Sequence, residues 1–301
     1  MLNLSSMPPI ERLRHPGPPQ QDRRQAVATV TTPVQIVLRP GIRLIDAVDE
    51  ALDAHGIGCA QIEFTGGVFD RISHCIPACS ADGSTAMSYS ERREAKVPAQ
   101  LLTASATVGY RDGERFMHCH AAWLDADGEI RAGHLWPETT IGPVPMYAVM
   151  HTLPGVSLLS SHDPETKMPT FVPHGEGTGS LAEHGKGLSR SGVCRILPNE
   201  DIVEAAEAVC ESLGFEHAVV RASLGSFVGA HLQHGDDEDV LVDGPATEVV
   251  NVVGTVNRDN TELSTILVDR HGAVHAGRLI RGRNLVAVTF ELFIVEDKPF
   301  P

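Results

Sequence analysis

The stretch FMHCHAAWLDADGEIRAGHLWP, residues 116–137, holds three histidines whose types and spacing suit metal binding. Alternate residues of a strand project to one face, so we expect His118 and His120 to converge while Cys119 points the other way. The chain then turns through an Asp-Gly segment and returns as a second strand, which brings His134 back toward the pair. Three neutral imidazoles with a remaining position for water or substrate are typical of catalytic zinc. Histidines of a half-buried sheet can also pair with local acceptors and bind no metal.

The elements that would position these histidines occur twice in the chain. Residues 39–68 align without gaps on a stretch that begins at residue 197, so that Gly56 meets Gly214. Each copy begins with apolar residues at helical spacing, reaches the glycine as a helix end, and continues as an alternating strand. The unit is therefore a helix followed by a sheet, made twice.

A hairpin follows in both copies, because LDADGEIRAGHL (124–135) matches VDRHGAVHAGRL (268–279). The second copy has Glu262, Ser264 and Arg278 where the first has its three histidines. The copy without histidines keeps the hairpin, so the fold does not require imidazoles there. This difference favours a chemical role for the three histidines of the first copy.

The duplication predicts two tandem domains of one α/β (α+β) fold, each a helix packed on a mainly antiparallel β-sheet. The Pro, Gln and Arg content of the N-terminus is typical of a flexible arm, and the Gly, Pro and Ser content between the copies is typical of a linker. The expected organisation is an arm (1–33), a first domain with the metal site (34–153), a linker or loop (154–192) and a degenerate second domain (193–301).

The charge and the apolar content of the chain argue against some classes of protein. Lys and Arg number 24 against 39 Asp and Glu, which gives a formal net charge of −15 that repels phosphate backbones. This charge weighs against nucleic acid as a partner. The chain has no apolar run of the ~20 residues that a membrane span needs, and its N-terminus has no secretory pattern. We expect a cytoplasmic protein with reduced thiols, and Cys75-x3-Cys79 is the nearest approach to a cysteine motif.

These motifs, in this order, resemble the PPC (plants and prokaryotes conserved) domain family, as a tandem two-copy prokaryotic member. The resemblance covers about residues 35–152, and a weaker copy covers about 194–295. The matching motifs are Arg39 with Gly41 and Leu44, Gly66-Gly67, His118-Cys119-His120, Asp125 with Gly128, and Gly133-His134-Leu135.

The resemblance implies an α/β fold with an antiparallel sheet, assembly as a homotrimer and, in prokaryotic members, three histidine ligands for a divalent metal, usually zinc. Those ligands would be His118, His120 and His134. The second copy, without them, would be a structural partner. Plant members carry an AT-hook and take part in DNA binding, whereas here Arg281-Gly282-Arg283 is followed by Asn284 rather than proline.

The sequence thus favours a metal-dependent enzyme, a hydrolase, lyase or isomerase, that acts on a small anionic metabolite. The alternatives are a DNA-associated regulatory protein like the plant members, supported by a basic N-terminal arm, and a non-catalytic metal-binding or ligand-binding protein. Gel-shift and turnover assays discriminate among them.

Other candidate site residues come from the first copy and the segment after it. Candidates for general acid or base are Glu114, Glu138 and His151. Guanidinium groups bind carboxylates in bidentate fashion. Candidate anchors for the substrate are Arg71, Arg92, Arg93, Arg111 and Arg115. Further side chains that could reach the cleft are His74, Tyr110 and the later histidines His162, His174 and His184.

Overall fold

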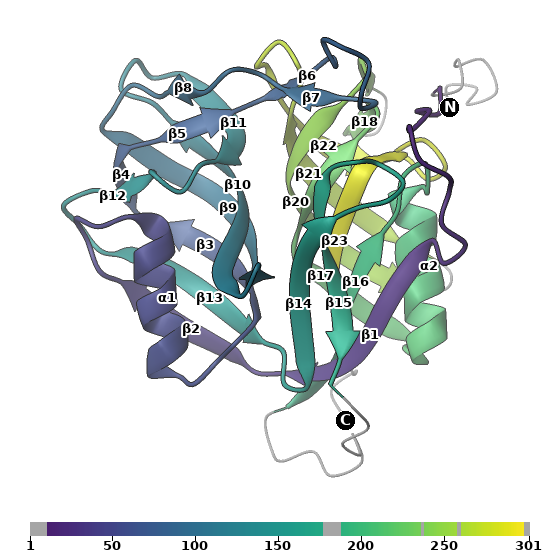
Figure 1. Ribbon diagram of the computed structural model, residues 1–301, viewed down its shortest axis with the longest axis horizontal. Coiled ribbons are helices and arrows are strands. Elements are labelled where there is room, and N and C mark those ends of the chain that lie inside the picture. The colour runs from purple at the N-terminus through teal and green to yellow at the C-terminus, as the bar shows by residue number, and fades with distance from the viewer. Residues whose placement is uncertain (1–10, 177–187, 236–237, 258–259, 298–301) are drawn as a thin grey trace.

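The computed structural model describes residues 11–176, 188–235, 238–257 and 260–297 (Figure 1). Within these ranges the chain forms two large sheets, each with one helix on its outer face, and the two sheets lie side by side. No helix of the described residues is long and apolar enough to cross a membrane. The predicted pair of mainly antiparallel units, each with one helix, is confirmed.

The first sheet has the strand order β2 (Pro33–Leu38), β13 (Met146–Thr152), β3 (Ala60–Gly66), β9 (Ala99–Arg111), β10 (Glu114–Leu124), β11 (Ile130–Leu135), β5 (Ser73–Cys75) and β8 (Arg93–Glu94). Four more strands join it off this path: β4 (Val68–Arg71), β12 (Thr140–Ile141), β14 (Val156–His162) and β15 (Pro169–Gly175). A separate short pair consists of β6 (Pro77–Ala78) and β7 (Ser88–Tyr89).

The second sheet has the order β1 (Arg24–Thr31), β16 (Ser189–Ile196), β23 (Val286–Glu296), β17 (His217–Phe227), β20 (Thr247–Asn257), β21 (Glu262–Val268), β22 (Val274–Leu279), β18 (Ala230–His234) and β19 (Glu238–Val242). The run from β16 to β18 follows the same topology as the run from β2 to β5 in the first sheet. The register agrees as well, because His120 pairs with His134 and Ser264 pairs with Arg278. The sequence repeat is therefore a structural repeat.

Each helix is amphipathic and seals the outer face of its own sheet. Helix α1 (Leu44–Ala54) buries the apolar side chains that the sequence spacing placed on one face, among them Val48 and Leu52. Helix α2 (Ile202–Leu213) is capped at its start by Asp201, whose carboxylate accepts from two backbone N–H groups, and at its end by Gly214 with φ 68°. Two separate cores result, one in each copy.

The inner faces of the two sheets meet in smaller apolar clusters that contain residues of both copies. Phe293 of β23 packs with Leu158 and Phe171 of the β14–β15 hairpin, and Ala122 of β10 packs with Val250 of β20. Alternation along β10 sends Cys119, Ala121 and Trp123 to the core under α1. The even-numbered side chains of β10, including both of its histidines, therefore face the second copy.

The N-terminal segment and the linker differ from the sequence expectation. Residues 24–31 are not a flexible arm: they form β1, an edge strand antiparallel to β16 in the second sheet. Part of the expected linker is likewise ordered, because β14 and β15 form a hairpin with full antiparallel register. The composition average concealed the buried residues of both segments, such as Val30 in β1 and the alternating Val156 and Leu158 in β14. Residues 1–10 and 177–187, with His184, lie outside the described residues.

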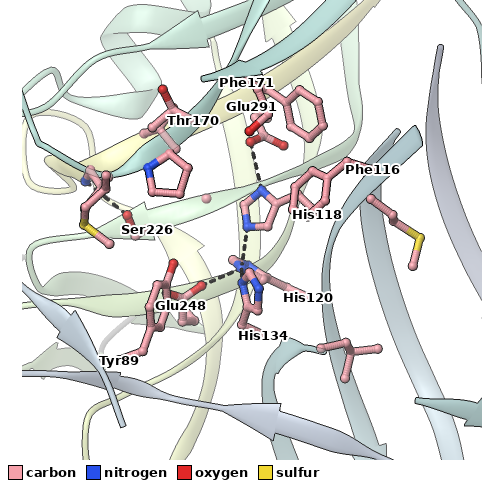
Figure 2. A pocket seen from close by; sticks show the side chains of 18 of the residues that line it. Tyr89, Phe116, His118, His120, His134, Thr170, Phe171, Ser226, Glu248 and Glu291 are labelled. Atoms are coloured by element: carbon pink, nitrogen blue, oxygen red, sulfur yellow. Dashed lines mark hydrogen bonds and ion pairs between the residues drawn. The ribbon is translucent and has the colours of Figure 1, made fainter. Parts of the chain in front are cut away.

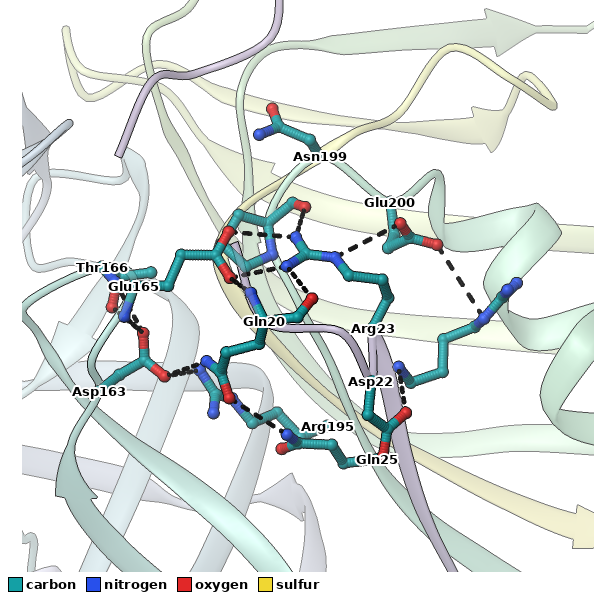
Figure 3. Close-up of polar contacts among 12 residues, drawn as sticks. Gln20, Asp22, Arg23, Gln25, Asp163, Glu165, Thr166, Arg195, Asn199 and Glu200 are labelled. Atoms are coloured by element: carbon teal, nitrogen blue, oxygen red, sulfur yellow. Dashed lines mark hydrogen bonds and ion pairs between the residues drawn. The ribbon is translucent and has the colours of Figure 1, made fainter. Parts of the chain in front are cut away.

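A polar network holds the turn of this hairpin against the second copy (Figure 3). Asp163 accepts from buried Arg195 of β16 at 2.7 Å, and Glu165 accepts from Arg23 at 2.6 Å. Gln20 donates to Asp163 at 2.8 Å. These charge-assisted contacts fix the hairpin in place, and its strands form one wall of the site described next.

Candidate metal centre

The three histidines predicted to act together do lie together. His118 and His120 extend from β10 and His134 from the facing position on β11, and one ring nitrogen of each lies within 4.8 Å of the other two (Figure 2). Nε2 of His118 is 3.0 Å from Nε2 of His120, which is 3.3 Å from Nδ1 of His134. Neighbouring ligand atoms around a tetrahedral zinc are separated by ~3.4 Å when the bonds are ~2.1 Å long. The cluster therefore has the size of a metal site.

The far sides of two of the rings are held by acceptors of the second copy. Nδ1 of His118 donates to the carboxylate of Glu291 at 2.8 Å, and Nδ1 of His120 donates to the carbonyl oxygen of Val249 at 2.8 Å. A neutral imidazole carries one proton, so these partners assign it to Nδ1 and leave a lone pair on Nε2. The two Nε2 atoms face each other across 3.0 Å, so a proton or a metal cation must lie beside them. The donor set thus fits a bound cation.

Two buried carboxylates supply the matching negative charge. Oε2 of Glu248 on β20 lies 2.5 Å from Nε2 of His120, and the Glu248 side chain is 2% exposed. Oε2 of Glu291 is buried without a hydrogen-bond partner in the described part of the chain. Buried carboxylates with unsatisfied oxygens are costly unless a positive charge lies near them. The two carboxylates therefore fit a positive charge at the histidine cluster, whether a metal ion or a proton on His120.

The pKa shifts in the cluster follow from burial and from these charges. Burial lowers the pKa of His120, but the neighbouring Glu248 carboxylate outweighs it, and the net shift is upward. Burial and the charges of the other two imidazoles keep the pKa of His134 well below its ordinary value. Burial, followed by the charge of Glu248, raises the pKa of Tyr89, whose hydroxyl hydrogen-bonds Glu248. The site therefore favours a neutral imidazole at His134, whereas the Glu248 carboxylate favours a protonated one at His120.

The cluster lines a cavity of about 430 Å³ between the two copies. Its walls come from β10, the β14–β15 hairpin, β23 and β20, and they are largely apolar, with Phe116 and Phe171 side by side at a ring-centroid distance of 5.6 Å. Arg111 brings a positive charge to this wall, and hydroxyl groups come from Ser160, Thr170, Ser226 and Thr289. Such a cavity suits a small molecule with an apolar body and a few polar groups.

Of the five arginines expected to anchor a substrate, Arg111 lines this cavity. Arg92 is close by, stacked on Trp136 and paired with Glu138 at 3.1 Å. The other three lie elsewhere: exposed Arg71 pairs with Glu94, exposed Arg93 belongs to β8, and Arg115 pairs with Asp53 beside α1.

The expected acid-base residues do not line the cavity. Glu114 is exposed at the start of β10, and Glu138 is engaged by Arg92. His151 is buried on β13, where its Nε2 lies 3.4 Å from Glu63. Closeness in sequence to the ligands did not bring these side chains to the cavity, because Glu114 lies at the far end of β10, Glu138 lies between β11 and β12, and His151 lies on β13.

The remaining histidine and tyrosine candidates that the structure describes do not line the cavity. His74 packs edge-on against Trp123 with a centroid distance of 4.9 Å, and burial lowers its pKa to about 4. Tyr110 packs in the cluster under the hairpin, beside Arg115. His162 and His174 are exposed on the hairpin. All six cysteines are free, and burial raises the pKa of Cys75 to about 12.

Sequence reasoning missed the residues from the second copy. Glu248 and Glu291 are isolated acidic residues inside strands that are otherwise apolar, TEVVNVV and VAVTFELFIV. A single carboxylate in such a run must be buried with a partner, which makes it a functional signal. That signal was present in the sequence, although the identity of the partner was not.

The chain belongs to the family of the Plants and Prokaryotes Conserved (PCC) domain, which matches residues 25–151 and 184–298. The two matched segments agree with the two copies, and they confirm the family that the motifs indicated. No protein in a comparison with curated proteins matches the chain.

Several solved structures are similar to parts of the chain. A plant- and prokaryote-conserved (PPC) protein of Pyrococcus horikoshii is 16% identical with a TM-score of 0.39, over 47% of this chain and 94% of its own. A metal-containing protein of Archaeoglobus fulgidus is 22% identical with a TM-score of 0.36, over 46% of this chain and 92% of its own. A candidate DNA-binding protein of Bacteroides thetaiotaomicron is 11% identical with a TM-score of 0.38, over 46% of this chain and 91% of its own.

Proposed function

We propose that this protein is a metal-dependent enzyme, with zinc as its metal, that acts on a small anionic metabolite by hydrolysis, hydration or isomerisation. His118, His120 and His134 hold the metal. When bound, the metal supplies a Lewis acid that polarises a water, carbonyl or carboxylate oxygen. The observation that carries the proposal is the convergence of three imidazole nitrogens, 3.0 and 3.3 Å apart, on the wall of a cavity that also holds a cation from Arg111.

The other residues of the cavity define how a substrate is held. The Arg111 guanidinium donates from Nε and Nη2 to Ser160, and its other edge, between Nη1 and Nη2, has N–H donors for a carboxylate or phosphate. The apolar walls around Phe116 and Phe171 take the substrate's body and exclude water, which strengthens every charge interaction inside. An anionic group at Arg111 would direct the rest of the substrate along this wall toward the histidines.

Metal analysis of the purified chain tests the proposal. We expect about one zinc per chain in the wild-type protein and a large loss in a His118→Ala variant. His162→Ala is the matched control, because His162 is exposed at the end of β14 and lies outside the cluster. A wild-type protein that takes up no divalent metal, or a His118→Ala variant with full metal content, would remove the proposal.

The proposed alternatives lead to different measurements. A regulatory protein of the DNA-binding kind should shift a DNA probe at moderate salt, which the net charge of −15 opposes. A protein that binds metal without turnover should load zinc yet convert none of a panel of small carboxylates. The homotrimer that the family resemblance implies is also part of this proposal, and light scattering of the full chain would check it.

A further inference from the structure

The second copy lost all three histidines, yet every described hydrogen bond to the far side of His118 and His120 comes from it. The Nδ1 atoms of these rings donate to Glu291 on β23 and to the Val249 carbonyl on β20, both at 2.8 Å. We infer that the second copy is a working half of the metal centre, in which Glu291 positions His118 and Glu248 supplies a counter-charge beside His120. This inference rests on the proposed function, because it concerns the same metal.

The first step of the argument is orientation. The His118 side chain is 13% exposed. Its ring must be held in one orientation for Nε2 to face a metal. Hydrogen bonding of Nδ1–H to a carboxylate fixes both the ring angle and the tautomer, so that the Nε2 lone pair faces the metal. Glu291 can do this because its own side chain is only 4% exposed and is packed between the sheets. Glu291 is thus a positioning residue, which acts through His118.

The second step is charge. Three neutral imidazoles leave both charges of a divalent cation uncompensated in a buried site. Glu248 and Glu291 bring two negative charges to the same place: Oε2 of Glu248 lies 2.5 Å from Nε2 of His120, and Oε2 of Glu291 is buried with no hydrogen-bond partner among the described residues. In the second sheet Glu248 pairs with Val268. The corresponding pair in the first sheet is Gln100 with Leu124, so Gln100 is the counterpart of Glu248, and it is exposed. The carboxylate is therefore particular to the copy that faces the histidines.

The third step is that neither copy contains the whole site. The ligands come from β10 and β11, while the acceptor and the counter-charge come from β23 and β20, in a strand arrangement that the two copies share. Duplication therefore allowed the two copies to specialise, because the first keeps the ligands while the second orients them and neutralises the metal's charge. Loss of histidines from the second copy leaves its inner face available for carboxylates.

Zinc affinity of the full chain tests the inference. After chelation, zinc is titrated back against a chromophoric competitor in the wild type, Glu291→Gln, Glu291→Leu and Glu248→Gln. Gln keeps an acceptor for His118 but removes the charge, whereas Leu removes both. We expect Glu291→Leu to weaken zinc binding about 10-fold to 100-fold. Glu291→Gln should weaken it less, and Glu248→Gln should weaken it by a similar factor of roughly ten. The absorption spectrum of bound Co²⁺ should change in the same order.

A matched control separates a role in zinc binding from a role that only holds the two copies together. Glu63 also joins them, through Arg221 at 3.2 Å and the backbone N–H of Ala222 at 3.0 Å, but it lies outside the metal centre. Glu63→Gln should lower thermal stability and leave zinc affinity within about twofold of the wild type. If Glu291→Leu does not fold, the isosteric Gln variants decide the question.

Three outcomes are distinguishable. Weaker zinc binding in the Glu291 and Glu248 variants, with Glu63→Gln unchanged, supports the inference. If all four variants bind zinc with an affinity within twofold of the wild type, the inference is overturned and the proposed function stays intact. A wild-type chain that binds no zinc overturns the proposed function itself.

Discussion

Arg111 lies over the ring of Phe116, with its guanidinium carbon 3.5 Å from the ring centroid, and donates from Nε and Nη2 to the hydroxyl of Ser160 at 3.1 and 2.9 Å. Burial lowers its pKa, and the carboxylates of Asp112 and Glu291 act on it only at a distance. Arginine nevertheless keeps its charge. Within the described residues no carboxylate forms an ion pair with Arg111, so a positive charge in the cavity wall is available to an anionic ligand.

Replacement of Arg111 by glutamine should therefore weaken the binding of small carboxylates. With benzoate as the probe and benzamide as its neutral analogue, we expect the wild type to favour benzoate. Arg111→Gln should lose ~10-fold or more in benzoate affinity, since a charge-assisted hydrogen bond contributes ~1.5–3 kcal/mol. Thermal shift or calorimetry measures this. Arg71→Gln, at an exposed ion pair, is the control, and an equal loss in that variant would argue against a specific anchor.

Removal of metal should lower the melting temperature of the whole chain, because the ligands and their acceptors lie in different copies. At zinc 100-fold above its dissociation constant, binding stabilises the folded state by ~2.7 kcal/mol. Such a change corresponds to a shift of roughly 5 °C in a chain of this size. Scanning calorimetry with and without a chelator measures it, and the His118→Ala variant should not respond. An equal response in that variant would point to metal bound elsewhere.

The Asp163–Arg195 pair should make stability fall in acid. Burial opposes ionisation of Asp163, but hydrogen bonds from Thr166 and from Arg195 outweigh it and lower its pKa to about 2. A carboxyl whose folded pKa is depressed stabilises the fold above its unfolded value, ~3.9, and loses that contribution as the pH falls toward 2. We expect the free energy of unfolding to decrease by about 2 kcal/mol over this window.

Asp163→Asn checks this assignment. The variant should lack that part of the acid dependence and should be less stable at pH 7 by about 3 kcal/mol, because buried Arg195 loses its counter-charge. Urea unfolding at a series of pH values gives both quantities. An Asp163→Asn protein with the same pH profile as the wild type would contradict the assignment.

A side chain at Gly109 should be costly, because β14 pairs with β9 in parallel directly beside this residue. A Cβ there would lie 2.2 Å from the carbonyl oxygen of Leu158 and 2.7 Å from its Cβ. Gly109→Ala should therefore move the hairpin that forms a cavity wall, and we expect a loss of ~1–3 kcal/mol in the free energy of unfolding. Gly66→Ala, where no atom lies within 4 Å of the added Cβ, should cost far less. Equal losses would mean that the close approach is not the cause.

Much of this protein follows from local sequence. The period of two along a strand already placed His118 and His120 on one face and Cys119 on the other, and the turn after Asp125 placed His134 opposite. The duplication, both helices and the hairpins were equally accessible, because each depends on residues that are near one another in the chain. Local pattern therefore determined the scaffold and the three candidate ligands.

Only the tertiary structure decided what surrounds those ligands. Glu291 is 173 residues from His118, and Val249 is 129 residues from His120, so no periodicity or spacing relates them. They meet because the inner faces of the two sheets pack together, an arrangement set by the shapes of many apolar side chains at once. The same packing turned the expected linker into a cavity wall and left Arg111, alone among the five candidate arginines, lining the cavity. Strand alternation is a local rule, whereas the approach of two faces is a property of the whole chain.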